Sequence, residues 1–180
     1  ATNPFGRITP SASTLQSQFH NSSLDPLCGA WMAAQLFDFH QFTGDRALLQ
    51  RIYPILRGSA EFVLDTLVPA PDGSLVIAPS TSPENHYFDP VTHKRVRITA
   101  GSTYHMSLVR AIFDATDRAA AMLEIDPAMR QRIAEARARL APLKLGPDGR
   151  ILEWAETYKE AEPGHRHISH LVGLHPFDSI

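Results

Sequence analysis

The stretch "LCGAWMAAQLFDFHQFTGDRALLQRIYPILRGSAEFVLDTLV", residues 27–68, decides the fold. Its first part carries Trp31, Phe39 and Phe42 at helical spacing, with alanines between them. Apolar residues at that spacing predict a helix, and the small residues around them leave little polar face. We therefore expect a helix over 27–43 that is buried on more than one side.

The second part of this stretch predicts a helix that turns back on the first. The tripeptide "TGD" at 43–45 gives a stop, a turn and a start, because glycine ends helices and aspartate caps them. The helical pattern resumes over 46–68 and contains Pro54, which should kink the helix or split it near Tyr53. We expect the two segments to form a helical hairpin with a short loop.

A second pair of helices is predicted further along the chain. One covers 103–124, and the next covers 126–143, with Asp126 as the N-cap and Pro127 at the first helical position. The chain therefore repeats a pattern in which a helical hairpin is followed by a less regular excursion.

The two excursions resemble each other in sequence. Each has an Asp-Gly turn, at 72–73 and at 148–149, then a short apolar run, then polar and aromatic residues. In the first excursion, residues 74–78 should be extended and residues 86–100 should form a small β-hairpin. The prediction is an all-α fold of stacked helical hairpins, an α/α toroid, with short β-excursions in loops that gather on one face.

Composition limits the classes of partner. The chain has 180 residues, of which 43% are hydrophobic and 20% charged, as in ordinary globular proteins. A formal net charge of -2 argues against binding to nucleic acid or to an anionic membrane, and no apolar run reaches membrane-spanning length. Cys28 is the only cysteine, so an internal disulfide is excluded.

The start of the chain differs from the rest. Residues 1–26 are rich in Ser, Thr, Pro and Gln without sustained periodicity, which predicts a poorly structured arm before a domain over 27–180. The first residues lack the basic-then-apolar layout of a signal peptide. The sequence does not indicate a compartment.

A single glutamate, Glu84, stands in the loop "STSPEN" at 80–85. Ser-Pro-Glu is a common helix start, but Asp89-Pro90 follows almost at once and would end any helix there. We therefore expect Glu84 on an ordered loop, where catalytic groups are often found. Most loop glutamates are simply solvated, and that alternative stays open.

A second polar cluster follows Glu153 and Trp154. The heptapeptide "GHRHISH" at 164–170 holds three histidines and an arginine. These histidines could bind a metal, could be hydrogen-bonded in a buried polar network, or could contact a ligand. A tryptophan beside polar donors and a carboxylate is suited to a sugar, since its ring packs on the apolar face while the donors bind hydroxyls.

Five motifs in order, "CGAWMAAQLFDFHQFTGD", "YPILRGSAEFVLDTLV", "PSTSPEN", "ILEW" and "PGHRHISHLVGLHP", resemble glycoside hydrolase family 95 from about Gly29 onward. This family contains inverting α-L-fucosidases that act on 1,2-linked fucose, and some members prefer α-L-galactose. The resemblance implies an (α/α)6 barrel, no metal or other cofactor, and a fucosylated oligosaccharide as substrate. Members of the family are often secreted or periplasmic.

The resemblance also implies roles for residues of this chain. Glu84 matches the general acid, which protonates the leaving glycosidic oxygen and so must be a protonated carboxyl group near neutral pH. The sugar pocket would be lined by residues of the same two clusters: Asn85, Glu153, Trp154, His165, Arg166, His167 and His170.

The base side of the reaction has no match in these 180 residues. The resemblance implies a water held by two asparagines and activated with an aspartate, and no such pair or aspartate is present in a matching context. We expect the acid half of the site on about half of a barrel, with apolar faces such as that of Trp31 and Phe39 left without partners. Such faces favour self-association or a complementing fragment.

The sequence leaves hydrolysis by the chain alone open. One alternative is a non-catalytic remnant that binds carbohydrate weakly. Another is a helical metal-binding module that uses His165, His167 and His170.

Overall fold

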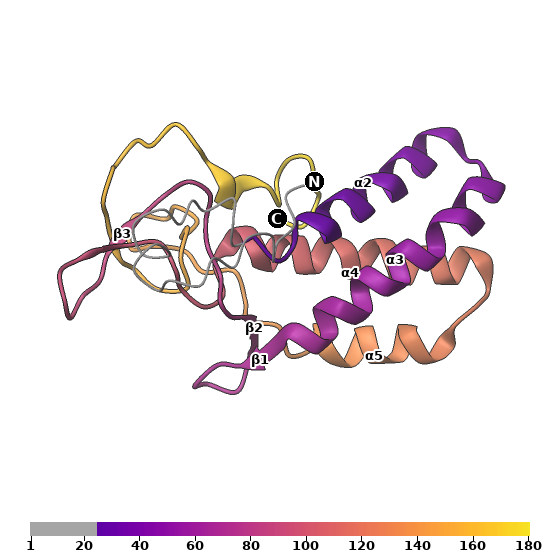
Figure 1. The fold of residues 1–180 in the computed structure, drawn as a ribbon, viewed down its shortest axis with the longest axis horizontal. Coiled ribbons are helices and arrows are strands. Elements are labelled where there is room, and N and C mark those ends of the chain that lie inside the picture. The colour runs from indigo at the N-terminus through magenta and orange to yellow at the C-terminus, as the bar shows by residue number, and fades with distance from the viewer. Residues whose placement is uncertain (1–24) are drawn as a thin grey trace, which may run out of the picture.

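The computed structural model describes residues 25–180. Four α-helices dominate this part of the chain: α2 (Cys28–Thr43), α3 (Arg46–Thr66), α4 (Thr103–Leu123) and α5 (Pro127–Arg137). They form two helical hairpins, α2 with α3 and α4 with α5, and α4 packs against the other three helices (Figure 1). The predicted helical hairpins are confirmed.

The ends of the helices lie where the capping residues predict them. Gly44 has a φ of 64°, and the Asp45 carboxylate accepts hydrogen bonds from the backbone N–H groups of Ala47 and Leu48 at 2.8 and 3.1 Å. Asp126 caps α5 by accepting from the backbone N–H of Met129 at 3.2 Å. These two caps fix the turn of the first hairpin and the start of the last helix.

Pro54 does not split α3, which runs through it as one helix of 21 residues. The proline removes one backbone donor, so the carbonyl of Gln50 loses its usual partner. Both Pro54 and Gln50 lie on the exposed side of the helix, where water can take the place of the missing donor. Of the two predicted effects of Pro54, a kink or a split near Tyr53, the split does not occur.

The hydrophobic core lies between α4 and its neighbours. Most of the residues of α4 are buried, so it is the central helix of this part of the chain. The largest side chains that are almost completely buried come from all four helices and include Phe37, Leu49, Leu56, Leu108, Ile112, Phe113, Met129 and Ile133. A core built mainly from these four helices confirms the predicted fold class.

The strands gather with the long loops at one end of the helices (Figure 1). β1 (Leu67–Pro69) and β2 (Leu75–Ile77) form an antiparallel pair around the first Asp-Gly turn. Both Asp-Gly turns have a left-handed glycine, with φ of 84° at Gly73 and 80° at Gly149. The likeness of the two excursions in sequence is thus also a likeness in backbone.

A three-stranded sheet joins the two excursions. β3 (Tyr87–Phe88) pairs with β4 (Arg95–Val96), which confirms the predicted hairpin, and also pairs with β5 (Lys159–Glu160) on its other side. The pairing of β3 with β5 was not predicted. It brings the loop after "STSPEN" next to the segment that leads into "GHRHISH". A short 3-10 helix, η2 (Ser169–Leu171), begins at the end of that heptapeptide.

Two expectations about α2 need correction, because Trp31 is not part of an unpartnered face and the helix is buried along one side only. Trp31 has partners, because its ring meets the edges of Tyr104 and Phe177 with ring centres 6.0 and 6.3 Å apart. Phe39 and Phe42, in contrast, are exposed, by 59% and 92%. Only part of the expected unpartnered stripe on α2 is therefore uncovered.

The domain also begins earlier than expected. Asp25, which the sequence prediction placed in the arm 1–26, is buried and hydrogen-bonded to side chains of α4. Residues 1–24 lie outside the described residues. Within 25–180, none of the helices combines the length and apolar character that crossing a membrane requires.

Candidate active site

The loop that carries Glu84 is held firmly at its start. Ser80, Thr81 and Ser82 are completely buried, and the backbone of Ser80 exchanges two hydrogen bonds of 2.8 Å with Thr99. The backbone N–H of Asn85 then donates to the carbonyl of Ser82 at 2.8 Å. This hydrogen bond closes a tight turn, and Glu84 lies within that turn.

A buried polar network lies under the same loop. The Ser80 hydroxyl lies 2.9 Å from Nδ1 of His105, and Nε2 of His105 lies 3.1 Å from Oδ1 of Asp25. The hydroxyl of Ser102 donates to the backbone carbonyl of Thr81 at 2.7 Å. His105 is thus a completely buried histidine that is hydrogen-bonded through both ring nitrogens, and it fixes the loop on the start of α4.

Glu153 holds the far side of the turn. Its Oε1 accepts from the Ser82 hydroxyl at 2.7 Å and its Oε2 from Nδ2 of Asn85 at 2.6 Å. The residue is only 8% exposed. The structure thus brings together Asn85 and Glu153, which the sequence analysis placed in one pocket although 68 positions separate them.

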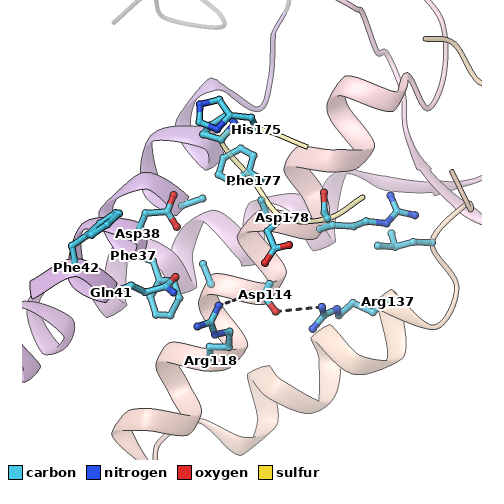
Figure 2. A pocket seen from close by; sticks show the side chains of 17 residues that line it. Phe37, Asp38, Gln41, Phe42, Asp114, Arg118, Arg137, His175, Phe177 and Asp178 are labelled. Atoms are coloured by element: carbon cyan, nitrogen blue, oxygen red, sulfur yellow. Dashed lines mark hydrogen bonds and ion pairs between the residues drawn. The ribbon is translucent and has the colours of Figure 1, made fainter. Parts of the chain in front are cut away.

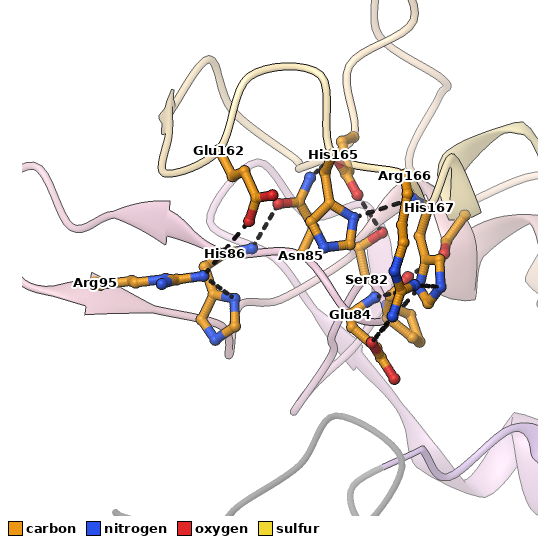
Figure 3. Close-up of polar contacts among 12 residues, drawn as sticks. Ser82, Glu84, Asn85, His86, Arg95, Glu162, His165, Arg166 and His167 are labelled. Atoms are coloured by element: carbon orange, nitrogen blue, oxygen red, sulfur yellow. Dashed lines mark hydrogen bonds and ion pairs between the residues drawn. The ribbon is translucent and has the colours of Figure 1, made fainter.

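Glu84 itself points outward and meets the histidine-rich segment (Figure 3). Its Oε2 lies 3.0 Å from Nη2 of Arg166 and 3.9 Å from Nδ1 of His167, and its backbone N–H donates to that same nitrogen at 3.2 Å. The Glu84 side chain is about half exposed. An Arg and a His from the segment 164–170 therefore lie directly against the predicted acid.

Further contacts join the two clusters. The hydroxyl of Ser169 bonds to the backbone carbonyl of Pro83, and the backbone N–H of His167 donates to Nδ1 of His165 at 3.0 Å. Arg166 also contacts the ring of His167. Hydrogen bonds to the Glu84 loop and within the segment itself thus hold the side chains of "GHRHISH" in position.

A cavity of about 470 Å³ opens beside the contact between the Glu84 loop and His167. Its wall includes six of the predicted substrate-binding residues, namely Asn85, Glu153, Trp154, His165, His167 and His170. Glu84 and Arg166 are not part of that wall but adjoin it through His167. The two sequence clusters therefore form one site rather than two.

Trp154 is more deeply buried than an aromatic ring on which a sugar stacks directly. Trp154 is 2% exposed, and its ring lies against Tyr87, with ring centres 4.9 Å apart. Tyr87 in turn stacks on Tyr158 at 4.3 Å and an interplanar angle of 12°. Trp154 is thus a buried part of the cavity wall, supported by the two tyrosines.

Two buried polar atoms of the wall have no hydrogen-bond partner among the described residues. They are Nε1 of Trp154 and Nδ1 of His170. The latter lies 3.9 Å from Oε2 of Glu153, which is too long for a hydrogen bond. Buried donors without partners are rare, and they often mark a site that binds water or a ligand.

The rim of the site has a polar group that the sequence analysis did not predict. Arg95 lies 3.3 Å from Nδ1 of His86 and 4.0 Å from the Glu162 carboxylate (Figure 3). Burial, and then the charges of Arg95 and Arg97, hold the pKa of His86 below its ordinary value. His86 is therefore neutral near neutral pH.

The geometry does not favour a metal centre. Within residues 25–180, no three His, Cys, Asp or Glu side chains converge as metal ligands. His165 and His167 lie edge to face, with ring centres 5.3 Å apart, and the latter is already engaged with the Glu84 loop. The alternative of a three-histidine metal module thus finds no support here.

A larger cavity, about 860 Å³, lies away from Glu84. It is a groove between α2, α4, the end of α5 and the C-terminal residues, with Phe42 at its edge (Figure 2). Asp114 pairs there with Arg118 at 3.2 Å and with Arg137 at 3.5 Å. None of the predicted site residues lines this groove.

Comparison with known proteins agrees with the motifs of this site. Residues 1–180 match the glycosyl hydrolase family 95 catalytic domain. The chain belongs to this family. Membership confirms the resemblance seen in the sequence.

Relatives of this family 95 domain carry fucosidase names. The chain is 33% identical over 160 residues to "Alpha-L-fucosidase 2" of Arabidopsis thaliana, which is 88% of the chain and 19% of that protein. It is 31% identical over 157 residues to "Probable alpha-fucosidase A" of Aspergillus niger, 84% of the chain and 19% of the relative. The chain thus spans about a fifth of the length of these relatives.

Sequence analysis of this family 95 domain missed two residues that hold the loop of Glu84 in place, Ser82 and Asp25. Ser82 was treated as a turn residue, and Asp25 was placed in the arm. Their contacts join positions 71 to 80 apart, so no local pattern signals them.

Proposed function

We propose that this chain supplies the acid side of the active site of an inverting α-L-fucosidase. The substrate is an oligosaccharide or glycan with a terminal 1,2-linked α-L-fucose, and Glu84 is the general acid. The observation that carries the proposal is the contact of Glu84 with Arg166 and His167 beside a polar and aromatic cavity.

Glu84 would protonate the glycosidic oxygen as the bond to the anomeric carbon breaks. The carboxylate that remains is then stabilised by the nearby guanidinium of Arg166, 3.0 Å away. The exposed position of Glu84 lets it reach an oxygen of the bound sugar, as a general acid must. Glu84 would have to leave its ion pair with Arg166 to donate a proton and could form the pair again afterwards.

The cavity beside Glu84 would hold the fucose ring. Imidazoles of His165, His167 and His170 can donate or accept hydrogen bonds with hydroxyl groups. Asn85 also lies in the wall, where its amide is bonded to Glu153 and to the backbone N–H of His86. Trp154 adds an apolar wall together with an unpartnered N–H. No metal or organic cofactor is required by this scheme.

The base side of the reaction would come from outside these residues. Inversion needs a water on the opposite face of the sugar, and its activating carboxylate lies about 6.5–9.5 Å from the acid. The two asparagines and the aspartate implied by the resemblance have no match in this chain. We infer that a longer chain or a second fragment supplies them.

One alternative keeps the fold but not the chemistry: a non-catalytic domain that binds carbohydrate weakly through the same cavity. It predicts saturable fucose binding that survives Glu84→Gln, without hydrolysis by the intact protein. The proposal predicts hydrolysis that Glu84→Gln abolishes.

The test is hydrolysis of 2'-fucosyllactose by the intact protein, followed by proton NMR of the released sugar. The proposal predicts that β-L-fucose appears first, as inversion of the α-linkage requires. Release of α-L-fucose first would refute inversion. A matched control is Glu135→Gln on α5, which should leave the rate unchanged. Among residues 25–180, the Glu135 carboxylate is hydrogen-bonded only to Gln131 of the same helix.

A further inference from the structure

Glu153 lies behind the predicted acid rather than beside the substrate. Each of its carboxylate oxygens already accepts one short hydrogen bond, from Ser82 at 2.7 Å and from Asn85 at 2.6 Å. The residue is 8% exposed, compared with a Glu84 side chain that is about half exposed. A carboxylate engaged in this way is poorly placed to bind a sugar hydroxyl.

The two partners of Glu153 are the two ends of one turn. Ser82 and Asn85 flank Pro83 and Glu84, and the backbone bond from Asn85 to Ser82 closes the turn at 2.8 Å. The Glu153 carboxylate is therefore hydrogen-bonded to both ends of the four-residue turn that contains Glu84. A change in its position would shift both ends together.

Glu153 is itself fixed to the start of the central helix. Its backbone carbonyl accepts from the N–H of Thr103 at 3.1 Å, and the Thr103 hydroxyl donates to the carbonyl of Leu152 at 2.5 Å. Thr103 is the first residue of α4. The turn is thus connected through Glu153 to the most buried helix of the domain.

We propose that Glu153 is a positioning residue that fixes the turn Ser82–Asn85 and so sets the direction in which Glu84 faces the substrate. This inference rests on the proposed function of Glu84 and replaces the expectation that Glu153 touches the sugar. Buried carboxylates that accept two short hydrogen bonds hold a structure strongly, because removing one partner leaves the other group unsatisfied.

The first test is hydrogen–deuterium exchange of the peptide that covers 80–86, which needs no substrate. Glu153→Gln puts an amide N–H₂ where an acceptor is needed, facing the hydroxyl of Ser82 or the amide of Asn85. We expect exchange in this peptide to become roughly tenfold faster or more. The matched control is Glu156→Gln, three positions away on the same segment, whose side chain is exposed and pairs with Lys144.

A reversed pair provides the rescue. Asn85→Asp combined with Glu153→Gln exchanges the amide and the carboxylate, so one donor again faces one acceptor. Exchange in 80–86 should return most of the way to that of the wild type. Wild-type exchange in Glu153→Gln, or a double variant as fast as the single one, would overturn the proposal.

If Glu153→Gln fails to fold, a milder variant still tests the proposal. Ser82→Ala removes one of the two contacts and keeps the carboxylate bonded to Asn85. Faster exchange confined to 80–86 in that variant supports the proposal, and unchanged exchange in a folded protein refutes it.

Kinetics separate positioning from sugar contact. A positioning role predicts that Glu153→Gln lowers kcat by about a hundredfold while the Kd of L-fucose stays within about twofold. A rise in that Kd of more than about tenfold with kcat unchanged would show a sugar contact instead. Absence of hydrolysis in the wild type would refute the proposed function without altering the exchange result.

Discussion

Nε2 of His105 lies 3.1 Å from Oδ1 of Asp25, and both side chains are buried beneath the loop that carries Glu84. Asp25 also accepts from the hydroxyl of Tyr104 at 2.7 Å and from the backbone N–H of Leu27 at 2.9 Å. The hydroxyl of Ser80 lies on the other side of the His105 ring, next to Nδ1. Ser80 is completely buried, so this Ser-His-Asp arrangement is a structural anchor and not a nucleophile for an external substrate.

His105→Ala should destabilise the domain. It removes a ring that contacts Asp25 and Ser80 and leaves both groups buried with fewer partners. Because a buried polar group then lacks its partner, we expect the free energy of unfolding to fall by about 2–4 kcal/mol. Urea denaturation measures this value.

The control for that measurement is Asp65→Asn, since the Asp65 side chain is 72% exposed and has only a long contact with Arg132. Its free energy of unfolding should stay within about 0.5 kcal/mol of the wild type. A His105→Ala variant as stable as this control would show that the buried network does not anchor the loop.

Acid should weaken the contribution of Asp25 to stability. Burial raises the pKa of Asp25, but the hydrogen bonds and charge of His105, with the bonds from Tyr104 and Leu27, outweigh it and hold the pKa below the ordinary value of 3.8. Because the folded pKa is the lower one, this stability is present above pH 3.8 and is lost as the pH falls through the folded value.

The measurement is the free energy of unfolding of the wild type and of Asp25→Asn from pH 7 to pH 2. The difference between the two proteins should be constant near neutral pH and should narrow in the acid range. A difference that grows on acidification would mean that the pKa of Asp25 is raised on folding.

Cys28 should react slowly with thiol reagents. Burial, followed by the negative charge of Asp25, raises the pKa of its thiol to about 11. Only roughly one molecule in a thousand then carries the thiolate at pH 8, so alkylation should be roughly a hundredfold slower than for free cysteine. Asp25→Asn should speed the alkylation of Cys28. An equal alkylation rate in the folded chain and in the urea-denatured chain would contradict this expectation.

The exposed apolar side chains of α2 should make the chain self-associate when it is studied by itself. Phe39 and Phe42 are large and exposed on one helix, and neighbouring Met32 is 64% exposed. Sedimentation equilibrium should show concentration-dependent association that Phe39→Ser with Phe42→Ser reduces.

A matched control for association is Val91→Ser, which removes an 83% exposed apolar side chain from the β3–β4 hairpin. This variant should associate like the wild type. A wild-type chain that stays monomeric at every concentration would show that α2 does not present an interaction surface.

The helical part of the fold could be predicted because its signals are local. Gly44 with Asp45, and Asp126 with Pro127, mark helix ends within a few residues, and the caps form as those residue types require. The split predicted as one effect of Pro54 does not occur because a proline on the exposed side of a helix can be accommodated, and exposure is a tertiary property.

The site could be predicted only in part. The residue types of "SPEN" and "GHRHISH" signalled polar chemistry, and the structure brings Glu84 against Arg166 as one pocket would require. The bond of Glu153 to Ser82 and the burial of Asp25 depend on how distant segments pack on the start of α4. No pattern within a short window carries that information.

The most direct test of the central claim compares two substrates in the wild type and in Glu84→Gln of the intact protein. Cleavage of 2'-fucosyllactose needs a proton on the leaving oxygen, whereas α-L-fucosyl fluoride releases fluoride with little such help. If Glu84 is the general acid, kcat/KM for 2'-fucosyllactose should fall by roughly 10²–10⁴-fold, and that for the fluoride should fall by less than about tenfold. Equal losses on both substrates, or no loss on 2'-fucosyllactose, would contradict the assignment of Glu84 as the acid.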